Sequence, residues 1–309
     1  MNTIICFRQG GNNLRIGNTL VWLENAIDWC KKNDFTFWLP EVNNILGELF
    51  DKSSSCFTVP TNWDKSIFYD DARFYSLLAR IVATMNEVKS KGSVSNFVFA
   101  CSVIPGMIAY IEPQGDTDWS NIPRELICFL KEHNLVIVNS PYPFKLTESS
   151  NTTSYLKPSQ QSIEFVNKLS SNHKTKIGIH IRQGDYKNWQ GGRYYQTSDF
   201  YNELISSILQ YKHNHIIDYD LLIVHSGEFE LSEANKNLLK SHLTYPDQKF
   251  SDAIRDFLVL SSCNLVIGPL STFSRQALKW GENYHSISGK WLPIDSQSNI
   301  LDIVNQIDH

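Results

Sequence analysis

Hydrophobic residues in the second half of the chain alternate between a strand-like and a helix-like period. Positions 176–182 alternate with period two, whereas the helix expected to open at Ser198–Asp199 carries one hydrophobic face, formed by Tyr201, Leu204, Ile205, Ile208 and Leu209. Similar signals predict helices at 163–169, 252–262 and 272–280, and strands at 220–225, 265–268 and 284–287. This alternation predicts a Rossmann-like layered domain over residues 160–309.

The first half of the chain begins with a strand–helix–strand pattern. A short apolar run at 3–8 precedes a glycine-containing loop, a helical spacing of apolar residues at 20–30 and a strand candidate at 35–39. Further elements are expected as helices at 73–88 and 123–133 and as strands at 96–104 and 135–139. Residues 140–159 are rich in Ser, Thr, Asn and Pro, so we expect them to link an N-terminal Rossmann-like domain, 1–150, to the second domain.

Composition narrows the class of protein. The chain has 309 residues, which suits two domains, and its hydrophobic (42%) and charged (19%) shares are those of a globular protein. A net charge of -4 argues against a broad basic surface, so no nucleic-acid partner is expected. No apolar run approaches membrane-spanning length and the N-terminus lacks a basic leader region, which predicts a cytoplasmic protein with no transmembrane segment. The six cysteines show no CxxC spacing, so no metal site is expected.

Candidate chemistry lies in the loop after the strand at 176–182. Arg182 ends this strand, and its planar guanidinium suits two phosphate oxygens at once. Gly184 allows the backbone to turn sharply and a ligand to approach closely. From its spacing alone, an ordinary surface or ion-paired arginine is the simpler interpretation of Arg182. His180 lies within the strand, where a hydrogen-bonded core histidine is the simpler interpretation.

A second candidate loop, residues 268–274, leads into the helix expected at 272–280. Ser271 and Thr272 are good helix N-caps, and the helix N-terminus presents unpaired N–H groups to an anion. Ligands of doubly wound sheets bind beyond the carboxyl ends of the strands, near the point where strand order reverses. The two loops together therefore predict a metal-free diphosphate site, although simple capping also explains Ser271 and Thr272.

Three segments resemble one glycosyltransferase group. The string IGIHIRQGDY is similar to the H-x-R-x-G-D-Y signature of the α1,2-fucosyltransferases and of their α1,6- and protein O-fucosyltransferase relatives. The stretch from Asp256 to Ser274 resembles the aspartate-to-S-T-F-S segment of that group. Arg15, Gly17 and Asn18 match its Gly-Asn motif in the first βα loop. The three motifs occur in the expected order over most of the chain.

The resemblance implies a GT-B-like α/β fold, with two Rossmann-like domains facing across a cleft, and a GDP-fucose donor bound mainly to the second. Arg182 would hold the β-phosphate, Ser271 and Thr272 would add hydroxyl contacts beside Phe273, Asp256 would shape the nucleotide site, and His180 would lie under the nucleotide beside the Gly184 turn. The loop with Arg15, Gly17 and Asn18 would face the transferred sugar and the acceptor, which places Asn18 with Arg182 and Asp185 in the expected catalytic set.

The expected activity is inverting, metal-independent transfer of fucose from GDP-fucose to a glycan or glycolipid acceptor, with no cofactor. Surface polysaccharide synthesis, with peripheral membrane association, is the expected context. Asp185 is a candidate base for the acceptor hydroxyl, but it is equally explained as a loop partner of Arg182. Trp189, Tyr194 and Tyr195 are expected to pack against the following helix. The alternative function is a non-catalytic sugar- or nucleotide-binding subunit with the same fold. A nicotinamide-dependent enzyme is disfavoured because no loop has the G-x-G-x-x-G pattern.

Overall fold

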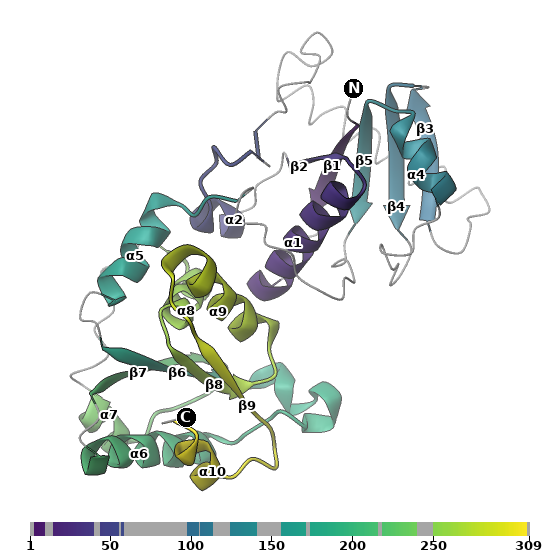
Figure 1. Ribbon diagram of the computed structural model, residues 1–309. Helices are drawn as coiled ribbons and strands as arrows, with labels where there is room; N and C mark the ends of the chain where they lie inside the picture. Colours follow the sequence, from purple (N-terminus) through teal and green to yellow (C-terminus); the bar gives the residue numbers. More distant parts are fainter. Residues whose placement is uncertain are drawn as a thin grey trace. The chain divides into compact units, whose positions relative to one another are not determined.

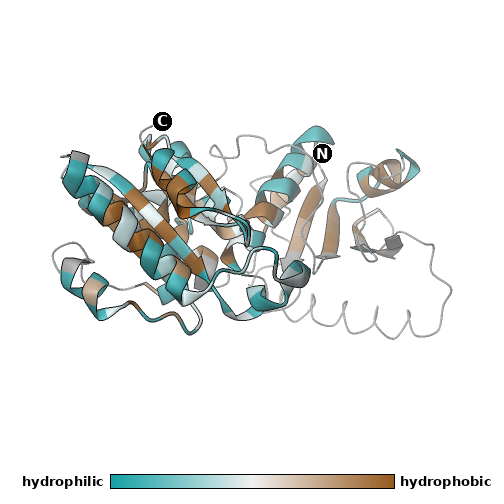
Figure 2. Ribbon diagram, turned by 90° about the horizontal axis from the view of Figure 1, so that it is seen from below, coloured by the Kyte–Doolittle hydropathy of each residue, from teal (hydrophilic) through white to brown (hydrophobic). Residues whose placement is uncertain are grey.

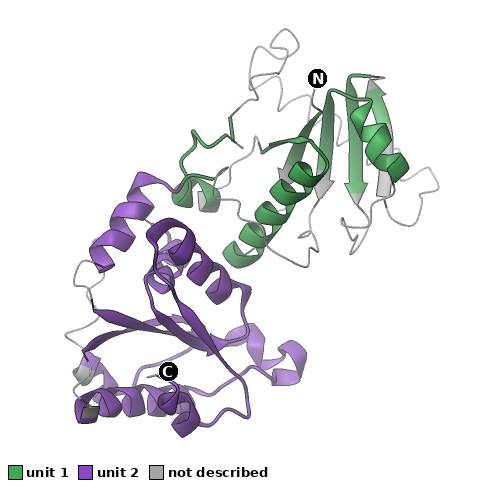
Figure 3. Cartoon of the chain, viewed as in Figure 1, with its two compact units in different colours: residues 1–157 green, residues 158–309 purple. Residues whose placement is uncertain are grey.

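The computed structural model describes residues 3–9, 15–39, 44–55, 57–58, 98–104, 106–113, 124–140, 156–170, 174–215, 218–239 and 250–307. The chain divides into two compact units, Met1–Lys157 and Pro158–His309 (Figure 3). Each unit contains a mainly parallel sheet with helices, and together they give the chain the two Rossmann-like domains of a GT-B-like fold. The expected helix at 73–88 and most of the expected link at 140–159 lie outside the described residues.

The first unit has a five-stranded sheet in the order β2-β1-β5-β4-β3. β1 (Ile4–Gln9), β2 (Thr36–Trp38), β4 (Ile108–Pro113) and β5 (Leu135–Ser140) are parallel to one another, and β3 (Val98–Ile104) pairs antiparallel with β4 at the edge. The helices are α1 (Ile16–Lys32), α2 (Asn44–Leu49) and α4 (Arg124–Lys131). The strands at 3–8, 35–39, 96–104 and 135–139 and the helix at 123–133 are therefore confirmed, whereas α2 and β4 were not predicted.

Aromatic packing fills the core of the first unit beside β1. The ring of Phe7 stacks on Phe37 at 5.1 Å between centroids and meets the edge of Trp22 at 5.7 Å. All three side chains are buried, and they join β1, β2 and α1. Their apolar area, together with the edge-on ring contact, stabilises the βαβ beginning that the periodicity predicted.

The second unit has a four-stranded parallel sheet in the order β7-β6-β8-β9. Its strands are β6 (Thr175–Arg182), β7 (Tyr219–Ser226), β8 (Leu265–Pro269) and β9 (Lys290–Ile294). Its α-helices are α5 (Gln160–Ser170), α6 (Ser198–His215), α7 (Glu233–Leu239), α8 (Asp252–Ser261), α9 (Thr272–His285) and α10 (Ile300–Asn305). Two short 3-10 turns, η2 (Gly184–Lys187) and η3 (Trp189–Gly192), follow β6.

This sheet is the middle of three layers. Figure 1 shows α5, α8 and α9 over one face and α6, α7 and α10 over the other. Ile177, Ile179 and Ile181 of β6 belong to the core with α6, α7 and α10, while His180 contacts α9 on the opposite face, as strand alternation requires. Hydrophobic residues accordingly gather on the strands and alternate with hydrophilic ones along the helices (Figure 2).

The predicted strand at 284–287 is wrong. α9 continues to His285, and Ser286 ends it in the left-handed conformation at φ 54°. Tyr284 lies one turn after Trp280 on α9, with the ring centroids 4.6 Å apart, so its aromatic side chain belongs to a helical face. The last strand of the sheet is β9, five residues further on.

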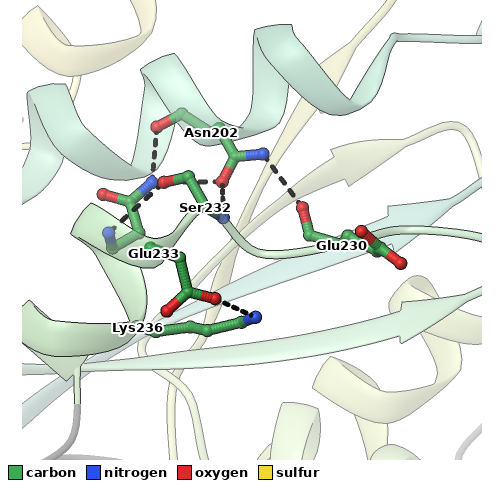
Figure 4. Close-up of polar contacts among 6 residues, drawn as sticks. Asn202, Glu230, Ser232, Glu233 and Lys236 are labelled. Carbon is green, nitrogen blue, oxygen red and sulfur yellow. Dashed lines mark hydrogen bonds and ion pairs between the residues drawn. The ribbon is translucent and has the colours of Figure 1, made fainter.

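A buried asparagine joins α6 to α7 (Figure 4). Asn202 of α6 accepts a hydrogen bond from the Ser232 backbone at 2.8 Å and donates to the Glu230 carbonyl at 3.0 Å. Asn235 of α7 is fully buried, and its amide donates to the Asn202 carbonyl at 2.8 Å and accepts from the Ser206 hydroxyl at 2.8 Å. These bonds fix the 230–235 segment against α6.

Replacing Asn235 by alanine is expected to lower the free energy of unfolding by about 1–3 kcal/mol, because the Ser206 hydroxyl and the Asn202 carbonyl lose a buried partner. Chemical denaturation measures the change. Asn214→Ala, at an exposed position of α6, is the matched control and is expected to stay within about 0.5 kcal/mol of the parent protein. Equal stability of the two variants would contradict the assignment of a stabilising role to the asparagine network.

Candidate active site

The candidate site lies at one edge of the second sheet. β6 ends at Arg182 and β8 ends at Pro269, and the two strands are parallel neighbours, with Ile177 opposite Leu265. The chain leaves β6 for β7 on one side and returns to β8 on the other, so strand order reverses between β6 and β8. This is the position at which open α/β sheets bind ligands. The structure thus brings the two predicted loops together.

Two helices begin at the same edge. α9 starts directly after β8, and α8 ends just before β8 begins, so the N-terminus of α8 lies toward the edge where β8 ends. α9 is 14 residues long, and its first-turn N–H groups add partial positive charge beside Arg182. Ser271 caps α9, its Oγ accepting a hydrogen bond from the Phe273 N–H at 3.2 Å. Thr272, the first helical residue, is exposed.

Arg182 is held by residues of its own loop. Its Nη2 lies 3.2 Å from Oδ2 of Asp185, and its Cζ lies 4.4 Å from the centroid of the Tyr186 ring. The Arg182 side chain is 14% exposed, whereas that of Asp185 is 49% exposed. A guanidinium has five donors, and among the described residues Asp185 is the one acceptor for its side chain. Arg182 therefore keeps donors for an anion.

The turn after Arg182 depends on glycine. Gly184 has φ +67°, a conformation that side-chain-bearing residues rarely adopt, which agrees with the sharp turn expected there. The Gln183 N–H donates to the Ser226 carbonyl at 3.1 Å, so the turn is tied to the end of β7. The Gly184 turn and the Gln183–Ser226 hydrogen bond together direct η2 across the edge of the sheet, toward the β8–α9 loop.

His180 connects β6 to the start of α9. Its Nδ1 and the Ser274 Oγ share a hydrogen bond of 2.7 Å, and its ring lies 5.3 Å from that of Phe273. Gly268 permits this close packing, since a Cβ there would stand 2.8 Å from the His180 carbonyl oxygen. Burial lowers the pKa of His180 to about 4. The interpretation of His180 as a hydrogen-bonded core residue is confirmed, and it fixes the helix end of the site.

The neutral form of His180 makes stability depend on pH. Between its ordinary pKa of 6.5 and its folded pKa of about 4, the unfolded chain binds a proton that the folded chain does not. Lowering the pH through this window is therefore expected to remove up to about 3 kcal/mol of unfolding free energy, and raising it restores that amount.

Unfolding measured at pH 7 and pH 4 in parent and His180→Gln proteins tests this expectation. The variant is expected to show the smaller loss on acidification, because glutamine does not titrate. His213→Gln, at an exposed position of α6, is expected to retain the parent pH dependence. Identical pH slopes for the parent and His180→Gln would show that His180 titrates normally.

Asp256 lies on α8, four residues after its start. Its Oδ1 accepts a hydrogen bond from Arg255 Nε at 3.0 Å, and its side chain is 20% exposed. Burial raises the pKa of the Asp256 carboxyl, against the opposite effect of the cationic Arg255 and of nearby His225. His225 belongs to β7, so Asp256 lies close to that strand. Arg255 also pairs with Asp252 at 2.9 Å and was not singled out in the sequence.

Arg15, Gly17 and Asn18 belong to the first unit. Arg15 is exposed and immediately precedes α1, while Gly17 and Asn18 lie within the first turn of that helix rather than in the preceding loop. The helix follows β1, so the three residues mark the same βα junction that the motif indicated. Their part in a site stays a prediction.

The aromatic residues after Arg182 form a ladder, defined here as Tyr186, Trp189 and Tyr194. Trp189 lies 4.9 Å from Tyr186 and 5.4 Å from Tyr194 between ring centroids, and it is 38% exposed. Trp189 and Tyr194 thus pack in the ladder that begins beside Arg182. The sequence predicted packing on the following helix and did not predict this ring contact. The ladder could not be found by periodicity, since η3 has irregular backbone at Gln190 and Gly191.

Two features of the described residues bear on partners. Within the described ranges, no helix is long and apolar enough to cross a membrane. The same residues contain no group of three or more His, Cys, Asp or Glu side chains placed to hold a metal ion.

Two Rossmann-like units, with an arginine and a helix N-terminus at the switch point of the second, agree with the expected GT-B-like fold. Residues 156–284 match the family model of glycosyl transferase family 11. This match confirms the expected resemblance of residues 156–284 to the fucosyltransferase group.

Solved structures share the fold at low sequence identity. POFUT1 in complex with GDP-fucose is similar at TM-score 0.54 and 13% identity, covering 96% of this chain and 98% of that chain. The apo form of POFUT1 gives TM-score 0.53 and 12% identity, covering 95% and 98%. No curated protein matches the chain in sequence.

Proposed function

We propose that this protein transfers fucose from GDP-fucose to a glycan acceptor, with inversion at the anomeric carbon and without a metal ion. The observation that carries the proposal is the convergence of Arg182 and the N-terminus of α9 at the switch point between β6 and β8. The family 11 match over the same residues supports fucosyl transfer, and POFUT1, which shares the fold, has been solved in complex with GDP-fucose.

The chemistry required of these residues is charge stabilisation. As the glycosidic bond breaks, the sugar gains oxocarbenium character and negative charge grows on the departing diphosphate. The Arg182 fork and the N–H groups of α9 would meet that charge with fixed donors that need little rearrangement. The diphosphate would be bordered by Ser271, Thr272 and the Gly184 turn. Beneath it would lie Phe273 and His180.

The other residues have proposed roles set by their positions. Asp256, half-buried near the end of β7, would help shape the nucleotide site. Asp185, exposed beside Arg182, is the proposed base for the acceptor hydroxyl. Contacts to the transferred sugar and the acceptor are proposed for Arg15, Gly17 and Asn18 of the first unit.

The proposed setting is cytoplasmic synthesis of a surface polysaccharide. A glycan or a glycolipid would be the acceptor, and a lipid-linked acceptor would bring the protein to the membrane surface as a peripheral enzyme. The linkage formed is left to product analysis of the transferred fucose.

Calorimetric titration with GDP in EDTA, with UDP and ADP as controls, tests the donor site. GDP-selective binding that survives EDTA is the expected result. Preference for UDP or ADP, or no nucleotide binding, would overturn the fucosyl assignment. GDP binding without any turnover of GDP-fucose over a panel of glycans would instead favour the non-catalytic subunit.

A further inference from the structure

Tyr186 contacts both halves of the proposed diphosphate site. Its ring lies under the Arg182 guanidinium, 4.4 Å from Cζ, and its hydroxyl donates to the Leu270 carbonyl at 2.6 Å. Leu270 immediately precedes the α9 cap, Ser271. Tyr186 is 5% exposed, so it is a buried residue and not a surface group.

The ring of Tyr186 lies against the Arg182 guanidinium, with Cζ 4.4 Å from the ring centroid. A cation over an aromatic face is attracted to it, and stacking leaves the edge donors of the guanidinium pointing outward. Trp189 packs on Tyr186 at 4.9 Å, which limits the movement of the ring. The Tyr186 ring that contacts Arg182 is therefore itself fixed by its contact with Trp189 of the ladder.

The hydroxyl of Tyr186 acts on the second loop. The Leu270 carbonyl and the Ser271 N–H belong to one planar peptide group, so a bond that fixes the carbonyl also fixes the direction of that N–H, which points the opposite way. Ser271 is 3% exposed, and its own hydroxyl is bonded to the Phe273 N–H. The tether therefore sets the direction in which the start of α9 presents its donors.

We propose that Tyr186 is a positioning residue that aligns Arg182 and the Leu270–Ser271 peptide for one diphosphate. The inference rests on the proposed function, since it assumes that Arg182 binds a diphosphate. It assigns separate tasks to two parts of one side chain. The ring acts through Arg182, whereas the hydroxyl acts through the loop before α9.

Affinity for GDP, measured by calorimetry, separates the two tasks. Tyr186→Leu removes the ring and the hydroxyl, and is expected to weaken GDP binding about tenfold or more. Tyr186→Phe keeps the ring and removes the tether, and is expected to weaken binding about three- to fivefold. Each variant is also made with Arg182→Lys, which keeps a charge but has no planar fork to stack.

Coupling between the two positions is the readout that a merely structural role would not move. In the Arg182→Lys protein, the loss of GDP affinity caused by Tyr186→Leu is expected to shrink to about the loss caused by Tyr186→Phe. The reason is that the planar guanidinium, which the ring contacts, is already absent. The effect of Tyr186→Phe is expected to be the same in both backgrounds. Equal, additive losses from Tyr186→Leu in the two backgrounds would overturn the inference, as would parent-like affinity of both tyrosine variants.

Tyr201→Phe is the matched control. Tyr201 is fully buried on α6, and its hydroxyl has no hydrogen-bond partner among the described residues. Its removal is expected to change GDP affinity less than twofold. Thermal unfolding of every variant checks that the proteins fold, and Tyr186→Phe provides the conservative replacement if Tyr186→Leu does not.

Inorganic pyrophosphate serves as a second probe, so that this inference and the proposed function can fail separately. Pyrophosphate binding with the expected coupling, but no GDP binding, would overturn the GDP-fucose donor and support the role of Tyr186. GDP binding without coupling would overturn the role of Tyr186 alone. Absence of binding by both probes would overturn both.

Discussion

Replacement of Arg182 by alanine is expected to slow the release of GDP from GDP-fucose about 100-fold or more. Arg182 lies at the end of β6, next to the strand that leads into α9, where we propose that it meets the charge that develops on the leaving diphosphate. Removal of one such fixed donor from a transition-state site typically costs about 100- to 1,000-fold in rate. Steady-state kinetics at saturating donor measure the loss.

Two further variants define the cause of the Arg182 effect. Arg182→Lys keeps the charge but cannot reach two oxygens with one planar group, so an intermediate rate is expected. Arg124→Ala, at an exposed position of α4, is the matched control and is expected to retain the parent rate. Parent-like turnover of Arg182→Ala would remove Arg182 from the mechanism and leave it as an ion-paired loop residue.

Asp185→Asn is expected to lower turnover about 100-fold while GDP affinity stays at or above that of the parent. The carboxylate lies 3.2 Å from Arg182 Nη2, so it competes with a diphosphate for the fork, and its removal releases that competition. The amide cannot accept the proton of an attacking hydroxyl, and loss of a general base typically costs 100- to 10,000-fold, to order of magnitude. Kinetics and calorimetry on the same preparation measure the two effects.

Azide distinguishes the role of Asp185 as a base from its role as a loop partner. Because azide attacks without losing a proton, it is expected to restore GDP release in Asp185→Asn but not in Arg182→Ala. Asp199→Asn, at an exposed position in the first turn of α6, is expected to behave like the parent. Unchanged turnover of Asp185→Asn would show that the Arg182 pair only stabilises the loop.

Local periodicity was sufficient to predict most of the second sheet. The alternating pattern of β6 and the hydrophobic face of α6 each arise because one side of the element is buried against its neighbours. β4 was missed because its strand follows a hairpin whose turn signal, Gly106 at φ +70°, was not used. The end of α9 was misplaced because Ser286, not glycine, takes the left-handed position that usually marks a helix terminus.

The site was predictable only in part, for a different reason. Arg182 and Ser271 could be found because Arg182 ends one strand, Ser271 follows another, and each has a chemistry of its own. The bond from Tyr186 to Leu270 joins residues 84 positions apart, and the bond from His180 to Ser274 joins residues 94 positions apart. Such contacts depend on the order of strands in the sheet, which no local pattern specifies.

Each contact described at the diphosphate edge, from His180 to Ser274, lies within residues 158–309. The family 11 match covers much of the same segment and does not reach the first sheet. If this edge binds the donor, as we propose, donor recognition depends on bonds that are all internal to residues 158–309.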